Sequence, residues 1–324
     1  MTETIQVYVG TDVSQLGAAE VLKQTILETS LDKNVNVHFM DKLSIPQPKD
    51  VRQSQRTGFS FARWAIPELA RYRGRAIYLD ADMMVFKDIR GLWETPMQGA
   101  TVAFVDGTDT SFCSDKAKGN KNETSVMLID CEKAKWSLVG LVEGLDGKYT
   151  YKEMMSDLCF LDEKDLSRAV PRIWNAMDFW NEDVHLLHFT NVPTQPWVSV
   201  DNPYGHVWVG TLKRLIEQSK IEAAYIHEQI VKGYFRPSLR FELQGEINLG
   251  KNPVYTEKLR AVDKQAGFVA HKDLMVFSQK RDRAIRLYEL MQAYQGDKKE
   301  FIRHAANYAL VEAKHMAKKI LKKS

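Results

Sequence analysis

Two aspartates separated by one residue follow an apolar segment within residues 75–86, RAIYLDADMMVF. Side chains of an extended segment alternate between faces, so Asp80 and Asp82 point the same way and can converge on one ligand. Two such carboxylates suit Mg²⁺ or Mn²⁺, which keep free coordination positions for phosphate oxygens. An N-cap or a turn is the alternative for a bare Asp-x-Asp, but the position after a buried strand favours a metal site.

Strands alternating with helices are expected before this pair. Residues 6–12 (QVYVGTD) predict a strand and a turn, and the residues after them have helical apolar spacing. Residues 35–40 predict a second strand, residues 59–72 a helix despite Pro67, and residues 76–79 a third strand. This alternation predicts an α/β fold, with a Rossmann-like, mostly parallel sheet and helices on both faces. Such sheets bind ligands at the carboxyl ends of their strands, where the acidic pair lies.

Composition limits the class of protein. The chain has 324 residues, enough for about two domains, and its apolar share of 44% predicts a soluble globular protein. A net charge of +3 is too small to indicate a nucleic-acid partner. Three cysteines without metal-type spacing fit a reducing compartment. No signal peptide or membrane-spanning segment is recognised, so we expect a cytoplasmic protein.

Two protein families place Asp-x-Asp directly after an apolar strand. In haloacid-dehalogenase-type phosphatases the pair closes the first strand, whereas here a strand–helix–strand unit and a further helix precede it. We also find no later Gly-Asp-x-x-x-Asp element that would complete that site. In nucleotide-sugar glycosyltransferases the pair holds a metal on the sugar diphosphate.

The stretch from Gln6 to Trp197 resembles glycosyltransferase family 8 of the retaining GT-A-type enzymes, which includes glycogenin and bacterial lipopolysaccharide galactosyltransferases. Five segments match in order: YVGTD, FARWAIPEL, YLDADMMV, VMLIDCEKAKW and HFTNVPTQPW. The resemblance implies a GT-A-type domain over residues 1–245. Residues 246–324 would then form a helical, basic C-terminal extension.

The resemblance also implies a nucleotide-sugar site. Gly10, Thr11 and Asp12 would lie along the uracil and ribose. Arg63 would face the donor sugar and its diphosphate, because a guanidinium binds phosphate through two parallel hydrogen bonds. The alternative for Arg63 is a solvated charge on a helix face.

A divalent cation, Mn²⁺ or Mg²⁺, is the implied cofactor. Asp80 would bridge the ribose and the metal, Asp82 would bind the metal, and His188 would match the third protein ligand of the family. Imidazole is an acceptable donor to Mn²⁺ beside carboxylates. A structural role is the alternative for a lone histidine, but His188 ends an apolar run and precedes a proline-containing loop.

Several positions depart from the family pattern. Gln195, before Pro196 and Trp197, replaces the usual phosphate-binding lysine; we keep Gln195 and Trp197 among the expected nucleotide-sugar contacts. Glu123 stands where an amide usually faces the sugar, and Asp157 is what remains of an Asp-Gln-Asp motif. We expect Glu123 and Asp157 to be the carboxylates closest to the reaction. They would accept hydrogen bonds from sugar hydroxyls rather than act as covalent nucleophiles.

The expected function is a metal-dependent hexosyl transfer from a nucleotide diphosphate sugar, with UDP as the expected nucleotide, to a glycan or lipid-linked sugar hydroxyl. The resemblance implies retention of configuration, and front-face attack and double displacement both remain open. The alternative is a catalytically degenerate scaffold that binds a glycan or nucleotide in a polysaccharide assembly complex. The lost lysine favours the scaffold, whereas the intact metal-ligand set favours the enzyme.

The end of the chain, residues 300–324, predicts an amphipathic helix with a basic C-terminal turn. Its apolar stripe would comprise Ile302, Ala306, Ala309, Ala313, Met316 and Ile320. One interpretation docks this helix on the sheet with its lysines at the C-terminal end of the helix dipole. The other attaches it peripherally to an anionic membrane, at the inner face, where a lipid-linked acceptor would lie.

Overall fold

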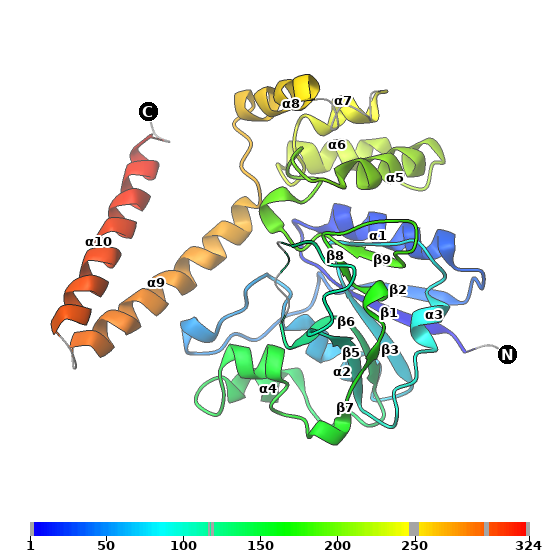
Figure 1. Ribbon diagram of the computed structural model, residues 1–324, viewed down its shortest axis with the longest axis horizontal. Helices are drawn as coiled ribbons and strands as arrows, with labels where there is room; N and C mark the ends of the chain where they lie inside the picture. Colours follow the sequence, from blue (N-terminus) through cyan, green and yellow to red (C-terminus); the bar gives the residue numbers. More distant parts are fainter. Residues whose placement is uncertain (1–2, 116, 118–119, 246–252, 295–297, 322–324) are drawn as a thin grey trace.

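The computed structural model describes residues 3–115, 117, 120–245, 253–294 and 298–321, with side chains except for 273–278 and 315–321 (Figure 1). Its strands are β1 (Ile5–Gly10), β2 (Val35–Phe39), β3 (Arg75–Asp80), β4 (Met83–Val85), β5 (Val102–Asp106), β6 (Asn122–Asp130), β7 (Leu166–Val170), β8 (Ala176–Met177) and β9 (Leu186–His188). Its α-helices are α1 (Leu16–Thr29), α2 (Ile66–Leu69), α3 (Arg90–Trp93), α4 (Leu138–Gly144), α5 (Gly205–Glu217), α6 (Ala223–Val231), α7 (Leu239–Leu243), α8 (Pro253–Gln265), α9 (Lys272–Tyr294) and α10 (Lys298–Leu321). Short helical turns are η1 (Val51–Gln53), η2 (Ala62–Ala65), η3 (Glu153–Asp157), η4 (Glu163–Asp165), η5 (Arg172–Trp174) and η6 (Val192–Thr194).

The main sheet has six strands in the order β2-β1-β3-β6-β5-β7. β1 pairs in parallel with β2 and β3, and β5 pairs in parallel with β7. Only β6 runs against its neighbours β3 and β5. The predicted α/β fold with a mainly parallel sheet is therefore confirmed.

A second, three-stranded sheet has the order β4-β9-β8. β4 follows β3 after two residues and pairs antiparallel with β9, which places Met83 opposite His188. The backbone N–H of Phe189 then donates to the carbonyl oxygen of Asp82 at 2.9 Å. This register brings His188, about 100 residues later in the chain, beside the acidic pair.

Side chains of the main sheet alternate between two apolar layers. Tyr8 and Tyr78 point to the face covered by η2, α2 and α4, whereas Val9 and Leu79 point to the face covered by α1 and α3. Burying an aliphatic side chain of this kind contributes about 1.5–3 kcal/mol, which explains why both faces of these strands are apolar. The strand β3 that carries Asp80 is therefore packed on both faces and lies between β1 and β6.

A third layer lies beyond α1. Helices α5, α6 and α7 gather over the small sheet and the outer side of α1 (Figure 1). Their core is aromatic: the rings of Trp197 and Trp208 lie 5.5 Å apart, and Phe235 packs edge-on against Trp208 at 5.6 Å. This layer fixes the loop that follows β9, and with it the position of His188.

The C-terminal helices α9 and α10 form a hairpin that projects from the rest of the molecule (Figure 1). α9 contacts η1, where the guanidinium of Arg52 stacks 3.6 Å from the ring centre of Tyr288. α10 packs on α9 and not on the sheet, so the docked-helix interpretation is not what the structure shows. Its stripe residues Ile302, Ala306, Ala309 and Ala313 are exposed, and the side chains of Met316 and Ile320 lie outside the described residues.

One expected element differs. The single helix expected over residues 59–72 is instead the short pair η2 and α2, with Pro67 in the first turn of α2, where its missing N–H costs nothing. Helix α8 likewise has a proline, Pro253, at its first position. Within the described parts of the chain, no helix combines the length and the apolar character needed to cross a bilayer.

Candidate active site

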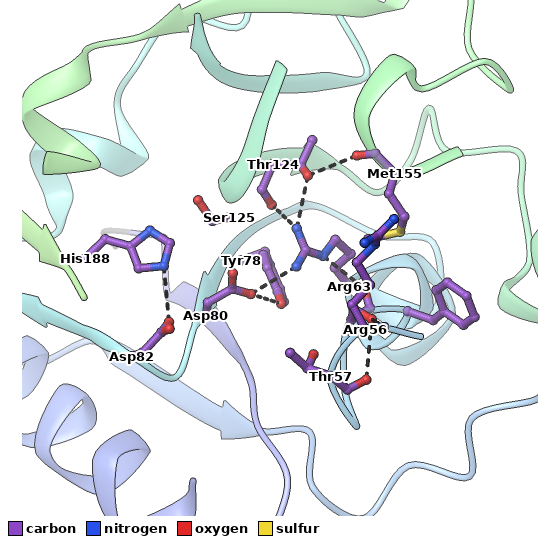
Figure 2. A network of polar contacts seen from close by, with 12 residues as sticks. Arg56, Thr57, Arg63, Tyr78, Asp80, Asp82, Thr124, Ser125, Met155 and His188 are labelled. Carbon is purple, nitrogen blue, oxygen red and sulfur yellow. Dashed lines mark hydrogen bonds and ion pairs between the residues drawn. The ribbon is translucent and has the colours of Figure 1, made fainter. Parts of the chain in front are cut away.

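Three side chains that could bind a metal meet at the junction of the two sheets. Asp80 is the last residue of β3, Asp82 precedes β4, and His188 is the last residue of β9. One ligand atom from each lies within 4.8 Å of the other two. Asp82 Oδ1 faces His188 Nε2 at 3.2 Å (Figure 2). The grouping expected from the sequence thus occurs in the structure.

These side chains line a cavity of about 560 Å³, which is of a size that binds small ligands. Its walls come from the turn before η2, the ends of β3 and β9, the start of β6, and η3. The lining is polar and carries both charges: Arg56, Thr57, Arg63, Asp80, Asp82, Asn120, Glu123, Thr124, Ser125, Tyr151, Lys152, Met155, Ser156, Met177, His188 and Thr190.

Arg63 is buried and bonded on all sides of its guanidinium. Nη1 donates to the carbonyl oxygen and to Oγ1 of Thr124, at 2.6 and 3.0 Å, and Nη2 donates to Asp80 Oδ1 at 3.1 Å (Figure 2). Nε donates to the carbonyl oxygen of Ser60. Arg63 is therefore no solvated surface charge, and its first effect is to fix Asp80 at the edge of the cavity.

Tyr78 also holds the carboxylate of Asp80 in place. Its hydroxyl donates to Asp80 Oδ1, and the guanidinium of Arg63 lies 4.6 Å from the centre of its ring. The ring occupies the space where residue 10 would carry a side chain, since an added Cβ on Gly10 would lie 2.2 Å from the hydroxyl oxygen. The glycine of the YVGTD segment is thus required by Tyr78.

Burial and neighbouring charges shift the pKa values of the acidic groups. Burial raises the pKa of Asp80, and Arg63 opposes this without cancelling it. Burial likewise raises the pKa of Glu123, and Arg172 opposes the shift. Burial alone would lower the pKa of His188, but the carboxylates of Asp82 and Asp80 outweigh it and the net shift is upward. The cavity thus concentrates negative charge that a cation would neutralise.

The donor set fits a divalent cation. Asn175 Nδ2 donates to Ser125 Oγ, which leaves Asn175 Oδ1 to accept from His188 Nδ1 at 3.0 Å. His188 Nε2 in the neutral ring is then a lone-pair donor that faces the buried oxygen of Asp82. Two acceptors in contact are unfavourable unless a cation or a proton lies between them. Carboxylate oxygens with one imidazole are ligands suited to Mn²⁺.

The two carboxylates expected nearest the reaction are placed differently. Glu123 is only 4% exposed and lines the cavity. Asp157, the last residue of η3, does not line it and instead pairs with Lys152 Nζ at 3.1 Å. Of the two, the structure brings Glu123 alone to the acidic pair.

The expected nucleotide-sugar contacts also separate. Gly10 ends β1, opposite Asp80 of β3, and Thr11 and Asp12 follow it, but none of the three is part of the cavity wall. Asp12 Oδ1 accepts from the N–H and the hydroxyl of Ser14 and so caps the turn. Gln195 and Trp197 lie in the core, at 0% and 1% exposure. Gln195 donates to Asp82 Oδ2 at 2.7 Å and faces no open space.

Two cationic residues of the cavity were not expected from the sequence. The guanidinium of Arg56 stacks 4.8 Å from the ring centre of Tyr151, and Lys152 follows that tyrosine. The segment QRTGFSFARW, with a basic residue and a glycine ahead of a family-like motif, carried a weak signal for Arg56. Asn175 had no signal, because its partners are 13 and 50 residues away in the sequence.

Comparisons with known proteins show sequence similarity to glycosyltransferases. Residues 5–136 match the family model described as Glycosyl transferase family 8. The chain is 23% identical over 190 residues to Protein CDI of Arabidopsis thaliana, covering 53% of this chain and 70% of that protein. It is 33% identical over 84 residues to Glycosyltransferase 8 domain-containing protein 1 of Xenopus tropicalis, covering 25% of this chain and 23% of that protein.

Solved structures with a similar backbone have low sequence identity. The galactosyltransferase LgtC, in complex with donor and acceptor sugar analogs, gives a TM-score of 0.41 at 14% identity, covering 64% of this chain and 95% of that chain. The glycosyltransferase GlyE of Streptococcus pneumoniae TIGR4 gives 0.47 at 17% identity, covering 64% and 60%. The bifunctional glycosyltransferase WbbM gives 0.47 at 13% identity, and this chain spans 50% of its length.

The family match contains the segment from β1 through Arg63 to the acidic pair at the end of β3, and it continues through Glu123 in β6. Over residues 5–136, this chain is similar to glycosyltransferase family 8.

Proposed function

We propose that the protein is a metal-dependent hexosyltransferase. It transfers a hexose from a nucleotide diphosphate sugar, with UDP as the nucleotide, to a sugar hydroxyl of a glycan or lipid-linked acceptor, with retention of configuration. The observation that carries this proposal is the meeting of Asp80, Asp82 and His188 on the wall of one cavity. Mn²⁺ or Mg²⁺ is the cofactor that these ligands would hold.

Each side chain of the cavity has a role in this proposal. Asp80, Asp82 and His188 would hold the cation, which would supply Lewis-acid stabilisation of the departing diphosphate, worth several kcal/mol. Arg63 fixes Asp80 and adds positive charge to the wall. Arg56 and Lys152 also line the cavity and would contact phosphate oxygens, in the place of the lysine that Gln195 replaces.

Glu123 would accept hydrogen bonds from donor-sugar hydroxyls. Its burial and raised pKa favour a residue that binds and orients a sugar in a water-poor site. Asp157 would serve indirectly, by holding Lys152 at the mouth of the cavity. Gly10, Thr11 and Asp12 remain the proposed contacts to uracil and ribose, because β1 lies beside β3 and its carboxyl end reaches the same edge of the sheet.

The acceptor is proposed to be presented at an anionic membrane surface. The exposed hairpin of α9 and α10 carries Lys298, Lys299, Arg303 and Lys314, followed in the sequence by Lys318, Lys319, Lys322 and Lys323. Such a cluster favours an anionic lipid surface by about 1 kcal/mol per residue at low salt. A lipid-linked acceptor would be held near the cavity by this attachment.

Thermal melting against a panel of nucleotide sugars, with and without Mn²⁺, tests the proposed function. A ligand at a hundred times its Kd adds about 2.7 kcal/mol of stability, which raises the melting temperature measurably. We expect stabilisation by UDP and one UDP-hexose, and only with Mn²⁺. Transfer is then measured with that donor. Stabilisation without any turnover across an acceptor panel would favour the scaffold alternative, and no stabilisation by any nucleotide sugar would contradict both.

A further inference from the structure

Gln195 joins two parts of the candidate metal site from within the core. It is completely buried, and its Nε2 donates both to Asp82 Oδ2 at 2.7 Å and to the carbonyl oxygen of Phe189 at 2.8 Å. Phe189 directly follows the histidine ligand, and its N–H donates to the Asp82 carbonyl oxygen. A single amide group thus ties Asp82 to the loop that carries His188.

Asn175 performs the matching task for the histidine. It is also completely buried, and both ends of its amide are bonded. Oδ1 accepts from His188 Nδ1 and Nδ2 donates to Ser125 Oγ, each at 3.0 Å. This arrangement fixes the orientation of the imidazole ring and directs Nε2 toward Asp82 Oδ1.

The two amides leave the ligand atoms ready for a cation. Gln195 binds one oxygen of Asp82, which turns the other toward His188 Nε2 at 3.2 Å. A neutral amide holds the carboxylate without cancelling its charge, whereas an ammonium group at the same place would form an ion pair and compete with a cation. The lysine-to-glutamine departure at residue 195 therefore has a local consequence for metal binding.

We propose that Gln195 and Asn175 are positioning residues that hold Asp82 and His188 for a divalent cation. Gln195 thereby acts on a metal ligand and does not contact the diphosphate. The inference rests on the proposed metal-dependent function and adds residues that act through the ligands.

The test measures Mn²⁺ affinity of the full chain without nucleotide, from the electron paramagnetic resonance signal of free Mn²⁺. The variants are Gln195→Met and Asn175→Leu, which keep the approximate shape and remove the hydrogen bonds. Gln229→Met is the matched control, because Gln229 is a buried glutamine on α6, outside the site. We expect Mn²⁺ to bind 10- to 100-fold more weakly to both site variants and unchanged to the control.

Two further variants keep the result decisive if a site variant folds poorly. Asn175→Asp retains an acceptor for His188 Nδ1 and should keep Mn²⁺ affinity within about threefold of the parent, since a carboxylate can also orient the ring. Gln195→Lys should weaken Mn²⁺ binding without tightening UDP, because its ammonium group would pair with Asp82. Tighter UDP binding in Gln195→Lys would instead return residue 195 to a phosphate role and overturn the proposal.

The outcomes separate this inference from the proposed function. A parent chain that binds no Mn²⁺ would overturn the metal site and, with it, both proposals. A parent that binds Mn²⁺ while Gln195→Met and Asn175→Leu match the Gln229→Met control would overturn only the positioning roles. Melting curves in EDTA establish that each variant is folded before its metal titration.

Discussion

Arg63 and Asp80 form an ion pair of 3.1 Å in which neither side chain is more than 15% exposed. Removing one partner of such a pair leaves the other charge buried, at a cost of about 3–5 kcal/mol. We expect Arg63→Leu to lose stability of this order in urea unfolding of the metal-free protein. Arg90→Leu, which removes a more exposed pair with Asp32, should cost no more than about 1 kcal/mol. Equal losses of unfolding free energy in the two variants would show that the pair of Arg63 with Asp80 does not stabilise the fold more than a surface ion pair does.

Asp82→Asn should abolish transfer while leaving the fold intact. The substitution keeps the size of the side chain and its contact with Gln195, but it removes a negative metal ligand. We expect turnover at saturating donor and Mn²⁺ to fall by at least about 100-fold, as when a strong transition-state interaction is lost. The exposed Asp183→Asn is the control. Turnover near the parent level in Asp82→Asn would contradict the metal site.

Gly10→Ala should destabilise the protein through Tyr78. The added methyl group would meet the Tyr78 hydroxyl at 2.2 Å, and the ring is fully buried and has no room to move. Overpacking of this kind costs about 1–3 kcal/mol. The double variant Gly10→Ala, Tyr78→Phe should recover part of the loss, which chemical denaturation measures. If the double variant is as unstable as the sum of the single ones, the two residues do not compete for this space.

Glu28 should give a pH-dependent contribution to stability. It joins α1 to α5 through Arg214, with contacts of 2.7 and 2.8 Å, and it pairs at 2.5 Å with Lys220, which follows α5. Hydrogen bonds from Arg214, the largest effect, hold its pKa below the usual value despite partial burial. A carboxyl whose pKa is lowered on folding stabilises the fold above its unfolded pKa, and this stability is lost as the pH falls through the folded value.

The measurement compares the parent with Glu28→Gln. At pH 7 the parent should be more stable by about 1 kcal/mol, since both cationic partners are partly exposed and solvent screens the pairs. This difference should shrink toward zero as the pH falls from 5 to below 4. The difference in unfolding free energy between the parent and Glu28→Gln reports on Glu28 alone, because all other carboxyl groups titrate in both proteins. A difference that stays constant with pH would contradict the assignment.

The basic hairpin should bind anionic vesicles reversibly. Co-sedimentation with anionic and neutral vesicles is measured across a salt series, with the full chain and with a chain that lacks residues 314–324. We expect binding to anionic vesicles only, weakened by salt as the Debye length shortens, and reduced by the truncation. Equal or absent binding to both vesicle types would remove the membrane proposal and leave the hairpin as a purely structural extension.

Local sequence signals predicted three of the six strands of the main sheet. The apolar runs that became β1, β2 and β3 are short and bounded by turn residues, so their type was recognisable. A single helix was wrongly predicted over residues 59–72, because its apolar residues have helical spacing. In the structure only part of the segment is helical, and Phe61 and Trp64 fill the core beside Tyr78. Tertiary packing, not helical propensity, decides that segment.

The part of the candidate site that could be predicted is the set of metal ligands, because their residue types and sequence motifs identify them. Asp80, Asp82 and His188 could be identified by residue type and motif, and their meeting follows from the pairing of β4 with β9. The side-chain directions of Asp157, Gln195 and Trp197 could not be predicted, since they depend on packing in three dimensions. The same holds for Arg63, whose partner Thr124 lies 61 residues away.

The metal ligands belong to two different sheets, with Asp80 on the six-stranded sheet and His188 on the three-stranded one. The two residues Ala81 and Asp82 connect β3 to β4, so the two sheets meet directly at the metal ligands. An ion bound by all three ligands would hold the two sheets together at this junction. Local opening of β9 would then require release of the ion, so the free energy of this opening would rise by the full binding free energy of the ion. Amide hydrogens of residues 186–189 would therefore exchange with deuterium more slowly. Amides at the centre of β1 would keep their exchange rates.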